Sequence, residues 1–329
     1  MQDRKVLTDP GELSPQKTPQ EKPKKKRRSE QPPVAVIDGL KWLVPQQNAD
    51  GSWGAEGLSV KATAMTLLAL LGDGGTHRSG PFKKNIRSGF LWLKSKQLPD
   101  GSFSTEESES AVATLAFCEI YRLTRSAAFR SLAQKGSEHL AGRFELKLKE
   151  RLRANLQAEF YGWSIMAMGS AIKSKLIEDK GRLKSASVKF DAAMDTETGR
   201  IKDDKSLSLT SIGLISLMHH AEDSKNRDLA KSRATVLLGK NLPAWNKKVD
   251  PVSILFGSMA AYNTGGELWL RWGEAMKTKV FTGQTRQGAE KGAWPRPVGE
   301  PDSRASVSDT ALMVLSAELH YRYGRVIGK

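Results

Sequence analysis

The stretch Gly39–Trp53, GLKWLVPQQNADGSW, returns fifty residues later as Gly89–Phe103, GFLWLKSKQLPDGSF. Both copies place a Gly, a Trp and a Leu on the first segment, followed by a Gln, an Asp-Gly-Ser turn and an aromatic residue. The turn glycines Gly51 and Gly101 supply the positive φ that such a turn requires, and the aspartate before each can accept hydrogen bonds from the turn backbone. A repeat of this length indicates one supersecondary unit used several times, here a helix, a loop and a second, more apolar helix.

Apolar periodicity and turn signals predict six such helical pairs along the chain. The pairs are Val34–Val44 with Val60–Leu71, Lys84–Lys96 with Ser108–Leu123, Ala127–Gly142 with Gln157–Lys173, Gly181–Met194 with Leu207–Ala221, Arg227–Lys240 with Pro251–Tyr262, and Leu268–Phe281 with Ser306–Tyr323. The second helix of each pair is apolar on most of its surface, which is typical of a buried helix. Six amphipathic helices alternating with six buried ones predict an all-α (α/α)6 toroid, a double ring with six outer and six inner helices.

The chain has 329 residues and a net charge of +16, which favours anionic partners without choosing among them. Residues 1–33 are rich in Pro, Gln and Lys and are predicted to be a disordered basic tail, with residues 34–329 forming a single toroid. Within the tail, Lys22–Arg28 (KPKKKRR) either contacts nucleic acid or an anionic membrane, acts as a nuclear import signal, or simply solvates the tail. The candidate anion-binding residues are Lys24, Lys25, Lys26, Arg27 and Arg28.

Cysteine content and hydropathy indicate the cellular compartment and whether a segment spans a membrane. Cys118 is the only cysteine, so an intrachain disulfide is excluded and a reducing compartment is favoured. The most apolar window, Ala62–Leu71, is too short to span a bilayer, and no apolar segment follows the N-terminal charges. The sequence therefore predicts a cytoplasmic protein without a transmembrane segment.

The spacing W-x(4)-Q-x(2)-D-G-S-W at Trp42–Trp53, with its near-copy at Trp92–Phe103, resembles the QW repeat of squalene and oxidosqualene cyclases, and protein prenyltransferase β subunits have related repeats. The closing segment from Gly265 to Tyr323 is similar to the last repeat of one-ring squalene-cyclase-like proteins of planctomycete-type bacteria. This resemblance implies a toroid with parallel inner helices around a central cavity. The residues assigned a structural role in the repeats are Trp42, Gln47, Gly51, Trp53, Trp92, Gln97, Gly101, Phe103 and Trp294.

The catalytic residues that the resemblance implies are incomplete. Class II cyclases protonate an alkene with the middle Asp of D-x-D-D-T-A, and the best match, Ser306–Ala311, has Ser308 at that position. A serine hydroxyl cannot protonate an isolated double bond, so Asp309 and Ser308 are only weak catalytic candidates. The pair Asp203 and Asp204 lies in a lysine-flanked loop and is interpreted as a solvated helix N-terminus.

A prenyltransferase-type zinc site is also not predicted, because Cys118 has no nearby Asp and a lone buried Cys usually packs as a small hydrophobe. We therefore expect no metal and no cofactor. The sequence predicts a non-catalytic binding or scaffolding module that engages a protein partner. The alternative is a divergent terpene-cyclase-like enzyme, or an isoprenoid- or lipid-binding protein, whose cavity is lined by Trp163, Tyr262 and Trp294.

Overall fold

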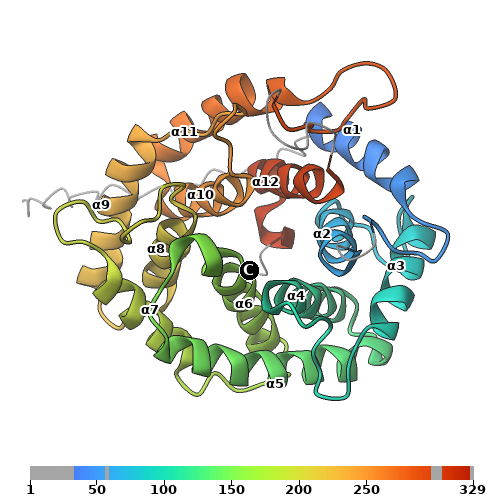
Figure 1. Ribbon diagram of the computed structural model, residues 1–329, viewed down its shortest axis with the longest axis horizontal. Helices are drawn as coiled ribbons and strands as arrows, with labels where there is room; N and C mark the ends of the chain where they lie inside the picture. The colour runs from blue at the N-terminus through green and yellow to red at the C-terminus, as the bar shows by residue number, and fades with distance from the viewer. Residues whose placement is uncertain (1–32, 56–58, 298–305, 327–329) are drawn as a thin grey trace, which may run out of the picture. The chain divides into compact units, whose positions relative to one another are not determined.

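The computed structural model describes residues 33–55, 59–297 and 306–326, and in this part of the chain α-helices alternate between an outer and an inner layer (Figure 1). The outer helices are α1 (Val34–Leu43), α3 (Lys83–Ser95), α5 (Ala127–Lys149), α7 (Arg182–Ala193), α9 (Ser224–Lys240) and α11 (Gly266–Ala275). The inner helices are α2 (Ser59–Gly72), α4 (Glu107–Thr124), α6 (Ala154–Lys173), α8 (Ser208–His220), α10 (Pro251–Thr264) and α12 (Val307–Val326). A 3-10 turn, η1 (Val44–Gln46), continues α1, and two short turns, η2 (Met276–Val280) and η3 (Phe281–Gly283), continue α11.

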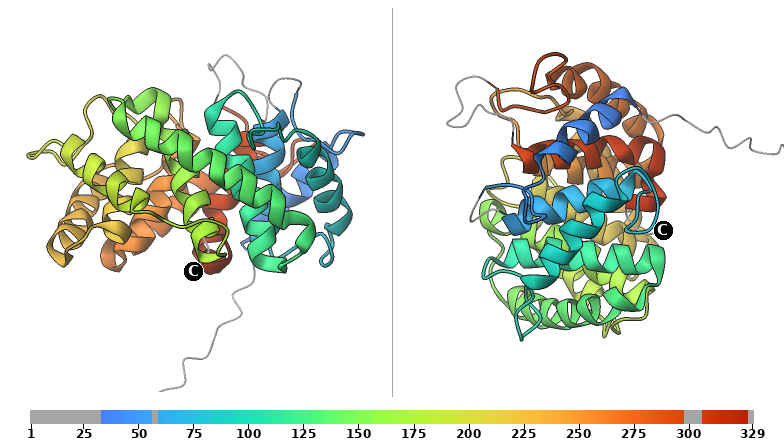
Figure 2. Two further views of the ribbon diagram at one scale, coloured as in Figure 1. Left: turned by 90° about the horizontal axis from the view of Figure 1, so that it is seen from below. Right: turned by 90° about the vertical axis from the view of Figure 1, so that its right-hand side faces the viewer.

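The inner ring is closed. Each inner helix packs against the next, and α12 packs against both α10 and α2 (Figures 1 and 2). The prediction of an all-α (α/α)6 toroid is therefore confirmed. The inner helices are buried because they are enclosed by neighbours on most sides; on α4, for example, every residue from Glu109 to Ile120 is buried. An apolar surface all around a helix needs this kind of environment.

The repeated loops tie each hairpin to the next outer helix. In the first copy, the Gln47 side-chain amide donates to the carbonyl of Gly51 at 2.9 Å and to that of Asn85, beside the start of α3, at 3.0 Å. Gly51 has φ 95°, and an added Cβ would lie 2.8 Å from the carbonyl oxygen of Ser88 on α3. The second copy has the same two bonds from Gln97, to Gly101 at 3.2 Å and to Leu132 on α5 at 3.0 Å.

A third copy of this bracing closes the ring. The Gln284 amide donates to the carbonyl of Gly292 at 2.9 Å and to that of Ala35 on α1 at 2.8 Å. The same side-chain geometry that joins neighbouring hairpins elsewhere therefore joins the last loop to the first helix. Gln284 therefore both holds its own loop, through Gly292, and closes the ring, through Ala35.

The residue after each turn is fixed by the inner helix. The backbone N–H of Trp53 donates to Thr63 Oγ1 on α2 at 2.8 Å, and the Trp53 indole N–H donates to the carbonyl of Leu43 at 2.7 Å. Three other loops repeat the first bond, from Phe103 to Ser110, Ile201 to Thr210 and Trp294 to Thr310, each at 3.1 Å. The hydroxyl residue near the start of an inner helix is thus part of the repeat. Thr310, which suggested a cyclase motif, has this bracing role.

Two features differ from, or lie outside, what the sequence predicts. The helix predicted over Ala127–Gly142 extends through the charged residues that follow, to Lys149. The basic tail with Lys22–Arg28 falls within residues 1–32, outside the described residues, so the division into tail and toroid stays a prediction. A search of the described helices for one that could cross a membrane finds none.

Candidate functional site

The inner helices α2, α4, α6 and α12 bring charged residues together where they begin. Lys61 Nζ on α2 lies 2.6 Å from both carboxylate oxygens of Glu159 on α6. Glu109 on α4 and Asp309 on α12 are close enough to this pair for its charges to affect their pKa values. These four residues together with Arg296 are called the carboxylate cluster below. They lie at the N-terminal end of the inner ring.

Glu109 differs from the other two carboxyl groups of the cluster. Glu159 pairs with Lys61 and Asp309 pairs with Arg296, whereas the hydrogen bond to Glu109 comes from a serine. The side chain of Glu109 is 8% exposed and accepts a hydrogen bond from Ser104 Oγ at 2.9 Å. Burial raises the pKa of Glu109, and the neighbouring charges of Glu106 and Glu159 add to that rise, although Ser104 and Lys61 oppose it. Glu109 is therefore set up to hold a proton at a higher pH than a solvated glutamate.

Asp309 lies in the same cluster but is fixed by an arginine. Arg296 approaches it with two nitrogens, Nε at 2.5 Å and Nη2 at 3.1 Å. Burial raises the pKa of Asp309, and the two hydrogen bonds and the charge of Arg296 offset part of that rise. Asp309 is thus a positioned carboxyl, while Ser308, the other weak candidate, lies beside it and is half-buried.

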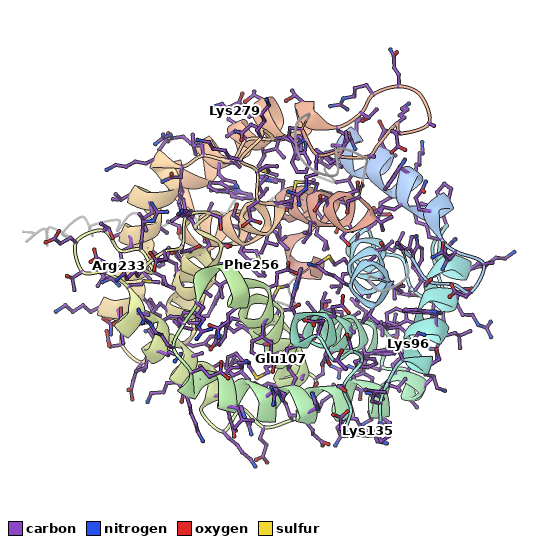
Figure 3. All side chains as sticks on the ribbon, viewed as in Figure 1. Lys96, Glu107, Lys135, Arg233, Phe256 and Lys279 are labelled. Carbon is purple, nitrogen blue, oxygen red and sulfur yellow. The ribbon has the colours of Figure 1, made fainter. Side chains whose placement is uncertain are left out.

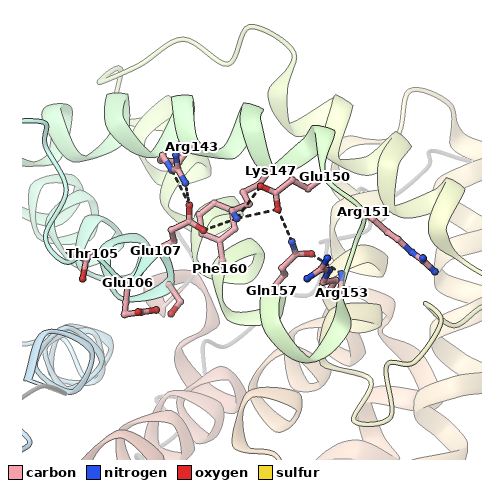
Figure 4. A pocket seen from close by; sticks show the side chains of 11 residues that line it. Thr105, Glu106, Glu107, Arg143, Lys147, Glu150, Arg151, Arg153, Gln157 and Phe160 are labelled. Carbon is pink, nitrogen blue, oxygen red and sulfur yellow. Dashed lines mark hydrogen bonds and ion pairs between the residues drawn. The ribbon is translucent and has the colours of Figure 1, made fainter.

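A polar groove runs alongside the cluster between α4, α5 and α6 (Figure 4). It consists of a pocket of about 750 Å³ and a second of about 310 Å³, which share the lining residues Thr105, Glu107, Arg143 and Phe160. Ser104 lines the second pocket and donates to Glu109, so one residue of the groove wall contacts the cluster. We call these joined pockets the α4–α6 groove.

Ion pairs shape the wall of the groove (Figure 4). Glu107 pairs with Arg143 and with Lys147, whose Nζ lies 3.1 Å from Glu107 and 3.2 Å from Glu150. Burial alone would raise the pKa of Glu107, but the hydrogen bonds and charges of Arg143 and Lys147 outweigh it and lower that pKa. Gln157 extends the network by donating its amide to Glu150 at 3.5 Å, and it accepts from the backbone N–H of Arg153 at 2.8 Å. Glu107 is a structural carboxylate, in contrast with Glu109 two residues later.

The three aromatic residues predicted to line a cavity lie within packed walls. Trp163 on α6 is 1% exposed and packs edge-on against Phe256 on α10, with ring centroids 5.5 Å apart. Tyr262 on the inner helix α10 packs against Trp269 on the outer helix α11, and so lies between the inner and outer helical layers. Trp294 is fully buried, and its indole donates to the carbonyl of Val280 at 3.1 Å. Other residues line the pockets described here.

The aspartate pair differs from the expectation of a solvated pair, while the cysteine is buried as expected. Asp203 is exposed, but Asp204 is 2% exposed and accepts from the backbone N–H of Thr210 at 2.6 Å, so the pair is not simply solvated. Cys118 is buried 3.3 Å from Ser137 Oγ, and burial raises the pKa of its thiol to about 12. A thiolate ligand is disfavoured there, and the described residues contain no cluster of three His, Cys, Asp or Glu able to hold a metal.

Sequence reasoning missed Lys61, Glu109 and Glu159. One signal could have identified Glu109: it precedes the bracing Ser110 just as Asp309 precedes the bracing Thr310, so both occupy one position of the repeat. Ala62 and Leu209 hold that position in two other hairpins. Glu159 has no comparable signal, because α6 follows a loop without the Asp-Gly-Ser turn.

No protein-family model matches this sequence, and no curated protein matches it. Among solved structures, it is similar to the GH76A α-1,6-mannanase of Salegentibacter sp. HEL1_6, with a TM-score of 0.63, 12% identity, and coverage of 87% of this chain and 97% of the other. Two inactive variants of that enzyme, each with two consecutive aspartates replaced and solved with α-1,6-mannotriose or α-1,6-mannotetrose, match with the same TM-score at 13% identity. At this identity the likeness shows the fold alone.

These neighbours contradict the family assignment made from the repeats. The solved toroids are mannanases, not squalene cyclases or prenyltransferases, so the squalene-cyclase-like assignment is wrong. The physical reason is that the Gln, Gly and aromatic residues of the repeat brace loops in a toroid, and bracing does not specify chemistry.

The functional predictions that followed from that family are contradicted with it. The predicted non-catalytic binding or scaffolding module, without enzymatic activity, conflicts with neighbours that are glycoside hydrolases. The alternative of a terpene-cyclase-like or isoprenoid-binding protein conflicts with the same neighbours, two of which are complexes with oligosaccharides. The absence of a cyclase motif excluded one reaction, and it said nothing about reactions that use other carboxylates.

Proposed function

We propose that this protein is a glycoside hydrolase whose active site is the carboxylate cluster. The observation that carries the proposal is the pairing of Glu109, a buried carboxyl with a raised pKa, with Glu159, a carboxylate held by Lys61 at 2.6 Å. Glycoside hydrolysis generally uses two carboxyl groups, one protonated and one ionised, with environments that keep their roles apart. The fold shared with the mannanases supports the same reading.

The roles follow from the two environments. Glu109 gives its proton to the glycosidic oxygen as the bond from that oxygen to the anomeric carbon breaks. Glu159, held by Lys61, takes the proton from the water whose oxygen forms the new bond to the anomeric carbon. Asp309, held by Arg296, positions the cluster from the α12 side.

The α4–α6 groove is the proposed binding site for the sugar chain. Its lining includes hydroxyl, amide, carboxylate and guanidinium groups, from residues such as Thr105, Gln157, Glu106 and Arg153, and these can pair with sugar hydroxyls. Because solved neighbours bind α-1,6-mannotriose and α-1,6-mannotetrose, an α-1,6-linked mannose oligosaccharide is the substrate class to test first.

The test is the release of new reducing ends from α-1,6-mannotetrose by the purified full-length chain. Glu109→Gln should lower kcat by at least about 100-fold, because general acid catalysis typically contributes that much or more. Glu138→Gln, at an exposed position on the outer helix α5, is the matched control and should retain wild-type activity. Wild-type protein that releases nothing from mannotetrose or from a panel of other oligosaccharides would contradict the proposal, as would full activity of Glu109→Gln.

A further inference from the structure

A further pocket lies between the inner helices α6, α8 and α10, which contact one another. Its volume is about 310 Å³, and its lining begins at Gly162 on α6, Ile212 on α8 and Phe256 on α10 and continues toward the C-terminal ends of these helices. Each helix contributes an apolar stripe at helical spacing, through Ile165 and Gly169, Ile212 and Ile215, and Phe256 and Met259. We call it the α6–α10 pocket; Figure 3 marks Phe256 on the inner layer.

Glycine at one position keeps this pocket open. An added Cβ at Gly169 would meet no atom within 4 Å, so the space beside it is not filled by neighbouring side chains. Gly162, two turns earlier on α6, is different, because the ring of Phe256 already occupies the place of its missing side chain. The hollow is therefore local to Gly169 and is bounded by well-packed residues.

The pocket also has polar groups suited to one end of a ligand. Ser170 is 4% exposed and lines the pocket, yet its Oγ has no hydrogen-bond partner among the described residues. Ser164, Ser211 and Ser216, also buried on inner helices, likewise have no partner among the described residues, but of these four serines only Ser170 lines the pocket. A buried hydroxyl without a partner carries a cost that a ligand acceptor would relieve.

The rim carries the positive charge. Lys173 and His220 lie there, and His219 Nε2 is 2.9 Å from Asn263 Oδ1. Burial, with the charges of His219 and Lys173, lowers the pKa of His220 to about 4, although Asp179 opposes this. His220 is therefore neutral near pH 7, and Lys173 supplies the charge that an anion would meet.

We propose that the α6–α10 pocket binds a compact amphipathic carboxylate with an aromatic body. The body contacts Ile165, Phe256 and Met259, and the carboxylate meets Lys173 and the Ser170 hydroxyl. A volume of about 310 Å³ is the space of about ten water molecules, which limits the ligand to a small ring system and excludes a long chain. This site does not depend on the proposed glycosidase activity, because it shares no lining residue with the α4–α6 groove.

The experiment titrates the full chain with 2-naphthoate and follows binding by calorimetry. Gly169→Leu should weaken binding at least tenfold, since the new side chain fills the pocket. Gly142→Leu on α5 is the matched control and should bind as wild type, because its Cβ also meets no atom within 4 Å but lies on an outer helix. No binding by the wild type, or equal binding by Gly169→Leu and Gly142→Leu, overturns the site.

A second variant and a second probe test the charge. Lys173→Gln should weaken 2-naphthoate binding about tenfold, the factor that corresponds to one lost charge-assisted hydrogen bond. The neutral 2-naphthalenemethanol should bind at least about tenfold more weakly than the carboxylate to the wild type. Equal affinity for the neutral and charged probes would overturn the assignment of an anionic ligand, even if Gly169→Leu abolished both.

Discussion

The two ends of the inner ring use burial in opposite ways. At the N-terminal end, burial raises the pKa of Glu109 and of Asp309. At the C-terminal end, burial lowers the pKa of His220 and of His320 to about 4. The same loss of solvation favours the neutral form in both places. It favours a protonated carboxyl where the groups are acids and a neutral imidazole where they are histidines.

Most connections between helices are longer at the N-terminal end of the inner ring than at the C-terminal end. Residues 284–306 join η3 to α12 at the N-terminal end, while Arg125 and Ser126 alone join α4 to α5 at the other. The difference is not uniform, since residues 150–153 alone join α5 to α6 beside the groove and residues 73–82 join α2 to α3 at the other end. The loops at the N-terminal end carry the braces of Gln47, Gln97 and Gln284. The predictions below test whether stability and pH response follow this division.

The largest expected effect is at the braced loops. Trp53→Ala should lower the free energy of unfolding by about 3–5 kcal/mol, because it removes a fully buried ring and its bond to Leu43. Tyr262→Ala, at the other end, removes a half-buried ring packed on Trp269 and should cost about 1 kcal/mol. Urea unfolding measures both. Equal losses would mean that the loops at the N-terminal end do not hold the ring more tightly.

Two glycines on α6 should respond to alanine with opposite signs. Gly162→Ala should destabilise the protein by about 1–3 kcal/mol, because its Cβ overlaps the ring of Phe256. Gly169→Ala should stabilise it by about 0.5–1 kcal/mol, because the methyl group enters open space and alanine favours the helix. Thermal unfolding of the two variants gives the comparison. A stabilised Gly162→Ala would show that Phe256 moves freely.

The histidines should make the protein less stable in acid. Their folded-state pKa values are about 4, below the usual 6.5, so the stability linked to neutral His220 and His320 is present above pH 6.5 and is lost as pH falls toward 4. His219, Lys173 and Asp179 face His220, and Lys277 faces His320.

The double variant His220→Gln, His320→Gln should therefore lose about 1–2 kcal/mol less than the wild type between pH 7 and pH 4. Urea unfolding at several pH values measures how the free energy of unfolding changes with pH in each protein. Packing lost in the variant lowers its stability equally at every pH, so it does not affect this comparison. Parallel stability curves would show that the histidines are already solvated.

A small effect is expected at Glu109, with a pH dependence opposite to that of the histidines. Its pKa is raised in the folded state, so its contribution to stability is full below the unfolded pKa of about 4.5 and is lost as pH rises through the folded value. Glu109→Gln should therefore stabilise the protein at pH 7 by about 0.5–1 kcal/mol, with no gain at pH 4.

Glu107→Gln should show the reverse, because the pKa of Glu107 is lowered and its ion pairs are present above pH 4.5. Comparing the two variants at both pH values isolates the environments of residues two positions apart on one helix. A Glu109→Gln variant that is less stable than the wild type at pH 7 would contradict the assignment of Glu109 as a poorly solvated acid.

The amino-acid sequence determined the architecture because its signals are local. The spacing from Gln47 to Trp53 contains the turn, the brace and the buried ring, and apolar helices such as α4 can only lie inside. The same locality explains the error in family: the brace is visible in the sequence, but it belongs to the fold and not to a reaction.

Only the tertiary structure decided the candidate sites. Lys61 and Glu159 are 98 residues apart in sequence and meet because the ring places the starts of α2 and α6 near each other. Glu107 and Glu109 look alike in the sequence, yet one faces Arg143 and the other is buried beside Ser104. Charge and burial at a site depend on what surrounds a side chain, and in a closed ring those surroundings come from distant parts of the chain.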